Sequence, residues 1–87
     1  MALNQTKAQG YLRFTEQAPI AGQKTLRWLV VGGSGAIGMV HWGAQWRKYV
    51  FSAGPNTYYD SSCLGEIAEF LYDKTFAHKH KVAVHVG

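Results

Sequence analysis

Apolar and polar residues alternate along the first half of the chain, which predicts short β-strands. Four segments have this pattern or a β-prone composition: residues 11–15, 25–31, 37–42 and 46–51. In the second of these, Leu26, Trp28 and Val30 fall on one face, because successive side chains of a strand point to opposite sides. The pattern therefore predicts a small antiparallel sheet, with residues 43–45 as the turn between its last two strands.

A glycine-rich stretch separates the second and third predicted strands. Gly33, Gly35 and Gly38 spell G-x-G-x-x-G, a spacing that opens a helix in dinucleotide-binding folds. The residues that follow, MVHWG, are poor helix formers and alternate as a strand does, so no helix N-terminus is expected there to hold a pyrophosphate. We therefore interpret residues 32–35 as the connection of a β-hairpin, where glycine reaches positive φ at little cost.

After residue 60 the apolar residues change to the spacing of a helix. Asp60, Ser61 or Ser62 can cap this helix by accepting a hydrogen bond from a free N–H of the first turn. The predicted apolar stripe is Leu64, Ile67, Ala68 and Leu71, flanked by Cys63 and Phe70. Three carboxylates are predicted on the opposite, solvent-facing side: Glu66, Glu69 and Asp73.

The two ends of the chain carry weaker patterns. Residues 1–9 are polar and small, and we expect a flexible arm or an arm that contacts another subunit. The predicted helix ends near residues 74–77. Beyond it, residues 78–87 are basic and then alternating, so residues 81–86 form either a final strand or a flexible end.

Composition places the chain among folded α+β proteins. Of its 87 residues, 47% are hydrophobic and 16% are charged, which fits one domain over residues 1–87 and argues against disorder. A single cysteine excludes an intramolecular disulfide, and no apolar stretch is long enough for a membrane span. We expect an antiparallel β-sheet of three to five strands with one α-helix packed on one face, in the cytoplasm and without a membrane partner.

Rings and charge point to partners outside the chain. The sequence contains three Trp, five Tyr and four Phe, and one helix covers only one face of a sheet. Because Trp28, Trp42 and Trp46 cannot all lie beneath that helix, we expect a homo-oligomer that buries the second sheet face or pairs an edge strand. The net charge of +4 favours an anionic partner, although the basic residues are too sparse for a dedicated duplex binder.

Aromatic and basic residues are densest around the turn predicted at residues 43–45. Indole rings stack on bases, and Arg and Lys pair with phosphates. The candidate ligand-binding residues are Trp42, Trp46, Arg47, Lys48, Tyr49, Tyr58 and Tyr59. Alternation predicts two faces for the last strand, with Trp46 and Lys48 on one and Arg47, Tyr49 and helix-facing Phe51 on the other. A structural alternative has the tryptophans covering a small core and Arg47 pairing with Glu66 or Glu69.

Other reactive residues favour structural roles. The apolar pattern around Cys63 is typical of a core residue, and no base and orienting group lie nearby in the sequence. His78, His80 and His85 lack the spacing of a structural zinc site. At the start of the helix, capping by Asp60 is favoured over anion binding, because its own charge opposes an anion there. We predict no catalytic residue, no metal and no cofactor.

One extended motif resembles a known group of proteins. It combines four parts of the sequence: Ile37-Gly38-x-Val40-x-Trp42, Trp46-Arg47-x-Tyr49-x-Phe51, Pro55 with Tyr59-Asp60, and Cys63-Leu64-x-Glu66-Ile67-Ala68-x-Phe70. This run, covering residues 37–71, resembles small phage-encoded accessory proteins of uncharacterised role. The resemblance implies a non-enzymatic inhibitor of a host system, and some such proteins sequester nucleotide-derived immune signals.

Together these patterns predict a non-catalytic protein that binds an anionic, nucleotide-like small molecule in the cytoplasm of a host cell. The motivation is the aromatic and basic cluster in a basic chain. Two alternatives remain open, namely a protein–protein inhibitor of a host factor and a protein that binds single-stranded nucleic acid.

Overall fold

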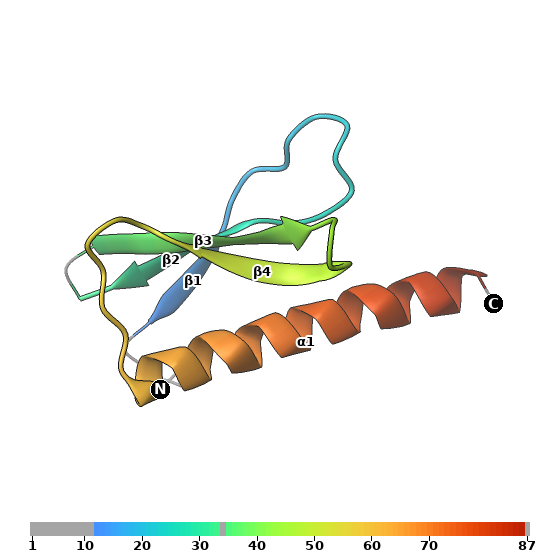
Figure 1. The fold of residues 1–87 in the computed structure, drawn as a ribbon. Helices are drawn as coiled ribbons and strands as arrows, with labels where there is room; N and C mark the ends of the chain where they lie inside the picture. Colours follow the sequence, from blue (N-terminus) through green and yellow to red (C-terminus); the bar gives the residue numbers. More distant parts are fainter. Residues whose placement is uncertain (1–11, 34, 87) are drawn as a thin grey trace.

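A computed structural model of the chain describes residues 12–33 and 35–86. Five elements follow one another: β1 (Arg13–Glu16), β2 (Trp28–Gly32), β3 (Gly35–Gly43), β4 (Lys48–Ala53) and α1 (Ser61–Val86). The strands form one antiparallel sheet in the order β1-β2-β3-β4, and α1 lies along one side of it (Figure 1). This architecture confirms the predicted α+β fold with a single helix on one face.

The glycine-rich stretch is a hairpin connection, as its composition predicts. Gly32 at the end of β2 pairs with Gly35 at the start of β3. Gly35 has a φ of 120°, which L side chains rarely adopt. Ser34 lies outside the described residues. The pattern G-x-G-x-x-G therefore spans a turn between two strands and the first residues of β3.

The hydrophobic core lies between the sheet and α1. Its fully enclosed side chains are Val30 and Val40, and Trp28 and Tyr49 are nearly as buried. The ring of Phe70 on α1 stacks on Phe14 of β1 at 3.9 Å and meets Trp28 edge-on at 5.1 Å. Such ring pairs add about 0.5–1.5 kcal/mol each beyond the burial of their area. Aromatic contacts between sheet and helix therefore add to the burial of the two valines in stabilising the core.

Helix α1 begins where its capping residue predicts. The Oδ1 atom of Asp60 accepts a hydrogen bond from the backbone N–H of Cys63 at 2.9 Å. This bond and the neighbouring N–H groups hold the pKa of the Asp60 carboxyl below its usual value.

The far end of α1 differs from the sequence prediction. The helix continues to Val86, so an end near residues 74–77 is wrong, as is a final strand over residues 81–86, whereas a flexible end stays a prediction. Neither glycine nor proline occurs between Gly65 and Gly87, and valine lowers helix propensity only slightly. Packing also continues past the predicted end, because the ring of His78 lies 4.4 Å from that of Trp42.

The face that α1 turns toward the sheet is rotated from the predicted stripe. Ile67 is buried and Leu71 is half-buried, as predicted, but Leu64 is 53% exposed and Ala68 is also exposed. The contact face continues instead through Lys74, whose Nζ lies 5.5 Å from the centre of the Trp28 ring. The predicted carboxylate face is only partly right: Glu69 and Asp73 are exposed, whereas Glu66 is half-buried and accepts a bond from the backbone N–H of Leu12 at 3.4 Å.

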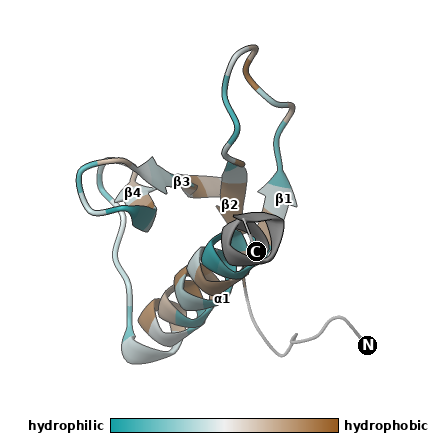
Figure 2. Cartoon of the chain, turned by 90° about the vertical axis from the view of Figure 1, so that its right-hand side faces the viewer, coloured by the Kyte–Doolittle hydropathy of each residue, from teal (hydrophilic) through white to brown (hydrophobic). Residues whose placement is uncertain are grey.

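The sheet face away from α1 carries aliphatic side chains together with the imidazole ring of His41. Alternation along the paired strands places Leu29, Met39 and Val50 there, each of them half-buried. The connection between β1 and β2 also rises on this side (Figure 2). Trp28 and Trp42 pack against rings of α1, whereas Trp46 is exposed, so the expectation that one helix cannot cover all three tryptophans is confirmed, and the homo-oligomer inferred from it stays a prediction. The most exposed rings lie off the sheet, in Trp46, Tyr58, Tyr72 and Phe76.

Candidate ligand groove between strand β4 and helix α1

An open cavity of about 410 Å³ lies between strand β4 and helix α1. It is lined by two residues of the strand and six of the helix: Lys48, Tyr49, Ala68, Leu71, Tyr72, Thr75, Phe76 and Lys79. Its volume falls in the range of small-molecule sites, which are commonly 300–1,000 Å³. We refer to this cavity and its eight lining residues as the β4–α1 groove.

The surface of the β4–α1 groove is mainly apolar and includes two exposed rings. Ala68, Tyr72 and Phe76 recur at four-residue intervals, so they form one row along α1. The side chain of Tyr72 is 80% exposed and that of Phe76 is 64% exposed. Rings with this exposure offer flat faces on which another aromatic group can stack.

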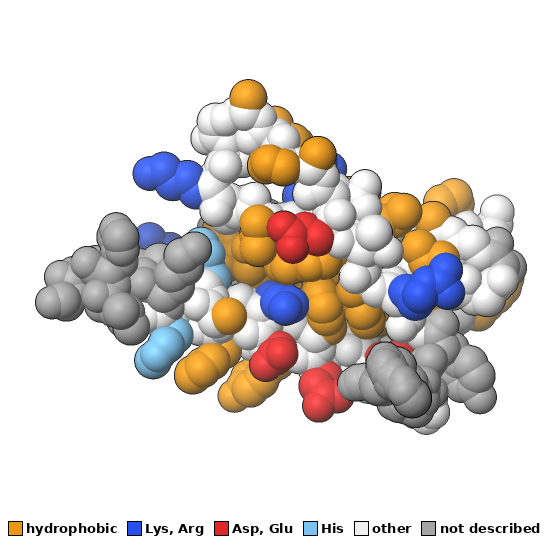
Figure 3. All heavy atoms as spheres, turned by 180° about the vertical axis from the view of Figure 1, so that it is seen from behind, with side chains coloured by type: hydrophobic (Ala, Val, Ile, Leu, Met, Phe, Trp, Pro, Cys, Tyr) orange, Lys and Arg blue, Asp and Glu red, His pale blue; other side chains and the backbone are white. Residues whose placement is uncertain are grey.

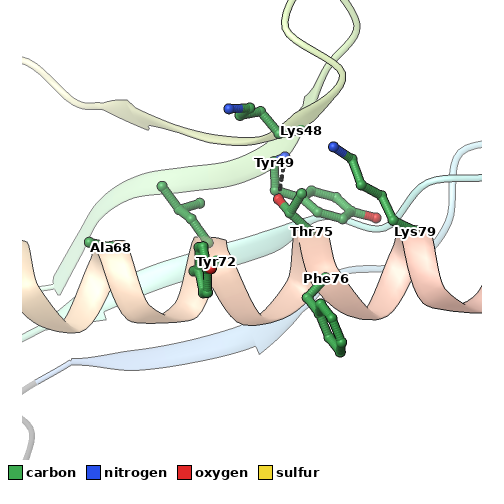
Figure 4. Close-up of a pocket in the computed structure, with 8 residues that line it drawn as sticks. Lys48, Tyr49, Ala68, Tyr72, Thr75, Phe76 and Lys79 are labelled. Atoms are coloured by element: carbon green, nitrogen blue, oxygen red, sulfur yellow. Dashed lines mark hydrogen bonds between the residues drawn. The ribbon is translucent and has the colours of Figure 1, made fainter.

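Two cationic side chains border the same groove from different elements. Lys48 begins β4, and Lys79 lies in the last third of α1; both are exposed. Figure 4 shows both lysines rising on the β4 side of the helix, above Thr75. An anion bound between strand and helix would therefore meet positive charge from both elements.

One hydrogen bond joins the strand wall of the groove to its helix wall, and a second holds the ring of Tyr49 in place. The hydroxyl Oγ1 of Thr75 accepts a bond from the backbone N–H of Tyr49 at 2.9 Å (Figure 4). The Tyr49 ring is 3% exposed, and its phenol oxygen accepts a bond from the backbone N–H of Leu26 at 3.1 Å. The first bond fixes β4 against α1, and the second holds the Tyr49 ring that lines the groove, so the groove exists before any ligand enters.

The structure brings only part of the predicted site to this groove. Lys48 and Tyr49 line it, whereas Trp42 packs beneath the helix, with its ring 5.0 Å from Tyr49 and 4.4 Å from His78. Trp46 and Arg47 lie in the β3–β4 turn rather than in a strand, so the prediction that the strand starts at residue 46 is wrong. Both residues are exposed, and Arg47 adopts a left-handed φ of 57°.

The remaining predicted residues lie on the chain between β4 and α1. Tyr58 is 93% exposed. Tyr59 is half-buried, donates a hydrogen bond from its phenol to the carbonyl oxygen of Ile37 at 3.2 Å, and packs edge-on against Phe51 at 5.6 Å. These contacts anchor the chain that leads into α1, and neither tyrosine lines the β4–α1 groove.

Sequence reasoning missed the helical half of the groove. Tyr72 and Phe76 continue the spacing of Leu64 and Ala68, so the row was visible in the sequence as apolar residues four positions apart. The predicted helix end placed Lys79 in a tail beyond the helix, so Lys79 was not among the predicted ligand-binding residues. A longer helix would have put Lys79 on the same side as Tyr72.

Other candidate chemistry is scattered over the described residues. Partial loss of water around the Cys63 thiol, together with its contact with Asp60, raises its pKa, which is the opposite of an activated nucleophile. The His41 Nε2 atom lies 2.7 Å from the Ser52 hydroxyl on the sheet face away from α1. Within residues 12–33 and 35–86, no three metal-ligating side chains converge, and no helix is long and apolar enough to span a bilayer.

Comparison of the sequence with protein-family models and with curated proteins, and of the fold with solved structures, gave no match. The geometry of the β4–α1 groove is therefore the basis for a functional proposal.

Proposed function

We propose that this protein is a non-catalytic binder of an anionic, nucleotide-like small molecule, which it holds in the β4–α1 groove. One observation carries the proposal: Lys48 and Lys79 come from different elements and border a single apolar groove that exposes the rings of Tyr72 and Phe76. The site inferred from sequence is thereby moved. Lys48 keeps its proposed role as a phosphate contact. The proposed stacking surface is formed by the rings of Tyr72 and Phe76 rather than by the tryptophans.

The two halves of such a ligand match the two kinds of surface. A base or another flat ring loses water when it stacks on an exposed aromatic side chain, which is worth about 1–3 kcal/mol per base. A phosphate gains charge-assisted hydrogen bonds from the ammonium groups at the rim. The net charge of +4 adds a long-range attraction for anions, which speeds association at low salt.

The biological role that we propose is sequestration of a nucleotide-derived signal in the cytoplasm of a host cell. The resemblance of residues 37–71 to small phage-encoded accessory proteins favours this role, because sequestration requires binding alone. Assembly as a homo-oligomer stays a prediction. Native mass spectrometry of freshly purified protein would report the number of subunits and any retained ligand together.

Isothermal titration with a panel of cyclic nucleotides and ADP-ribose derivatives tests the proposed ligand class. The informative variant is Lys48→Ala/Lys79→Ala, and the matched control is Lys24→Ala, which removes one exposed charge from the connection between β1 and β2. We expect the double variant to lose about tenfold or more in affinity, because charge-assisted bonds contribute about 1.5–3 kcal/mol each. The control should change affinity by less than about twofold.

A second pair of variants separates stacking from charge. Tyr72→Ala removes an exposed ring inside the groove, and Tyr58→Ala removes an exposed ring outside it. Only the first should weaken binding. No heat with any compound of the panel, together with no ligand retained through purification, would overturn the proposal. Binding that tolerates Tyr72→Ala but falls steeply with salt would favour single-stranded nucleic acid instead.

A further inference from the structure

Residues 17–27 connect β1 to β2 and form a loop that stands off the sheet on the side away from α1 (Figures 1 and 2). We name this segment the β1–β2 loop. A few hydrophobic side chains lie among the backbone and polar atoms of its outer end, at the top of Figure 3. Among them Ile20 is 44% exposed, and it lies in the sequence Ala18-Pro19-Ile20-Ala21, in which every residue is exposed.

The base of the β1–β2 loop is closed by hydrogen bonds. The backbone N–H of Gln17 donates to the carbonyl oxygen of Arg27 at 2.8 Å, so the first and last residues of the loop meet. The Nη2 atom of Arg27 reaches back across the loop and donates to the carbonyl oxygen of Ala18 at 2.9 Å. Leu26 is tied to the sheet through its bond to the phenol of Tyr49. These bonds set the direction in which the loop projects.

The tip of the β1–β2 loop is also ordered by its own turn. The backbone N–H of Gln23 donates to the carbonyl oxygen of Ile20 at 2.9 Å, and Gly22 has a φ of 87°, which suits the third position of a tight turn. Pro19 directly precedes Ile20, and its ring fixes its own backbone φ. An exposed aliphatic side chain is therefore held at the end of a preorganised loop, which lowers the entropy cost of docking it.

The charged side chains of the β1–β2 loop are all positive. Residues 17–27 contain Lys24 and Arg27 and no carboxylate. A partner surface that fits the loop would be apolar at its centre and acidic at its rim.

We propose that the β1–β2 loop is a protein-docking element that places Ile20 in an apolar pocket of a partner protein, with acidic residues of that pocket facing Lys24. Central aliphatic or aromatic anchors in a desolvated pocket carry most of the energy of such contacts, while charges at the rim mainly set orientation and association rate. The loop projects from the sheet face opposite α1, so this interaction goes beyond the ligand groove and leaves it open (Figure 1).

Site-specific photo-crosslinking of the full-length protein tests the proposed docking. Ile20 is replaced by a photoreactive phenylalanine analogue, and the same analogue at the exposed position Tyr58 is the control. After irradiation in a bacterial lysate, adducts are identified by mass spectrometry, and each partner is purified. Its affinity is then measured for the unmodified protein and for Ile20→Asp, Lys24→Glu and Tyr58→Ser.

We expect a discrete adduct from position 20 that is absent from position 58. Ile20→Asp should weaken binding of the purified partner by at least about tenfold, because it places a charge on the apolar anchor. Lys24→Glu should slow association, because it reverses a charge at the rim of the contact. Circular dichroism of each variant should match that of the unmodified protein, since all three replaced side chains are exposed.

Two results would overturn the docking proposal. One is the lack of any discrete adduct from position 20, and the other is a partner whose affinity is unaffected by Ile20→Asp. Nucleotide titrations on the Ile20→Asp protein keep this test separate from the proposed function, because that substitution leaves the β4–α1 groove intact.

Discussion

Replacement of Gly38 by alanine should destabilise the fold more than its single added methyl group suggests. Gly38 lies in the central strand β3, paired with Val30 on one side and Ala53 on the other. A Cβ atom at this position would lie 2.6 Å from Cε1 and 2.7 Å from Cζ of the Phe51 ring, and it would also overlap the backbone carbonyl oxygen of Ser52.

The size of the effect follows from what must move. Ordinary van der Waals contact begins near 3.4 Å, so the Phe51 ring would have to retreat by about 0.8 Å. The carbonyl of Ser52 belongs to β4, and its displacement strains the pairing of Met39 with Ser52. Overpacking of this kind commonly costs 1–3 kcal/mol, and the backbone contact favours the upper end. About 3 kcal/mol corresponds to a fall of roughly 12–24 °C in the unfolding midpoint for a domain of this size.

Thermal unfolding followed by circular dichroism measures this effect, with Gly33→Ala as the matched control. A Cβ atom at Gly33 would meet no atom within 4 Å, and its φ lies outside the left-handed region, so the control midpoint should stay within about 3 °C of the unmodified protein. A Gly38→Ala protein that melts as high as the control would refute the close approach of β3 and β4 on which the reasoning rests.

Three further outcomes are expected. Thr75→Val removes the acceptor of the Tyr49 amide while keeping the side-chain shape; it should cost about 1–2 kcal/mol in urea unfolding and speed hydrogen exchange of that amide. Asp60→Ala should lower the unfolding midpoint near neutral pH. Because the folded-state pKa of Asp60 lies below 3.8, this difference should shrink as the pH falls below that value, and a constant difference would count against the cap. Cys63 should react with iodoacetamide more slowly in the folded protein than in urea, because its pKa is raised; equal rates would contradict this.

Features with local causes were predictable from the sequence. The glycines at residues 32–35 turn the chain locally. The Asp60 carboxylate caps the helix through a bond only three residues away. The face shared by Tyr49 and Phe51 was also right, although the strand begins at Lys48 rather than at residue 46. A shift of two residues leaves the alternation of a strand unchanged.

Tertiary packing decided the features that join distant parts of the chain. Apolar residues at 63–76 allow more than one helix face, and the rings of Phe14 and Trp28 selected the face that includes Phe70. That choice left Leu64, Tyr72 and Phe76 exposed.

The sequence by itself determined the α+β fold, the hairpin turn and the start of the helix, because alternation, glycine and capping are read over a few neighbouring residues. Only the tertiary structure decided which rings were enclosed, how far the helix continued and that Lys79 would border the same groove as Lys48. Those outcomes depend on the rotation and position of α1 against the sheet, which result from the sum of many contacts between residues far apart in the chain.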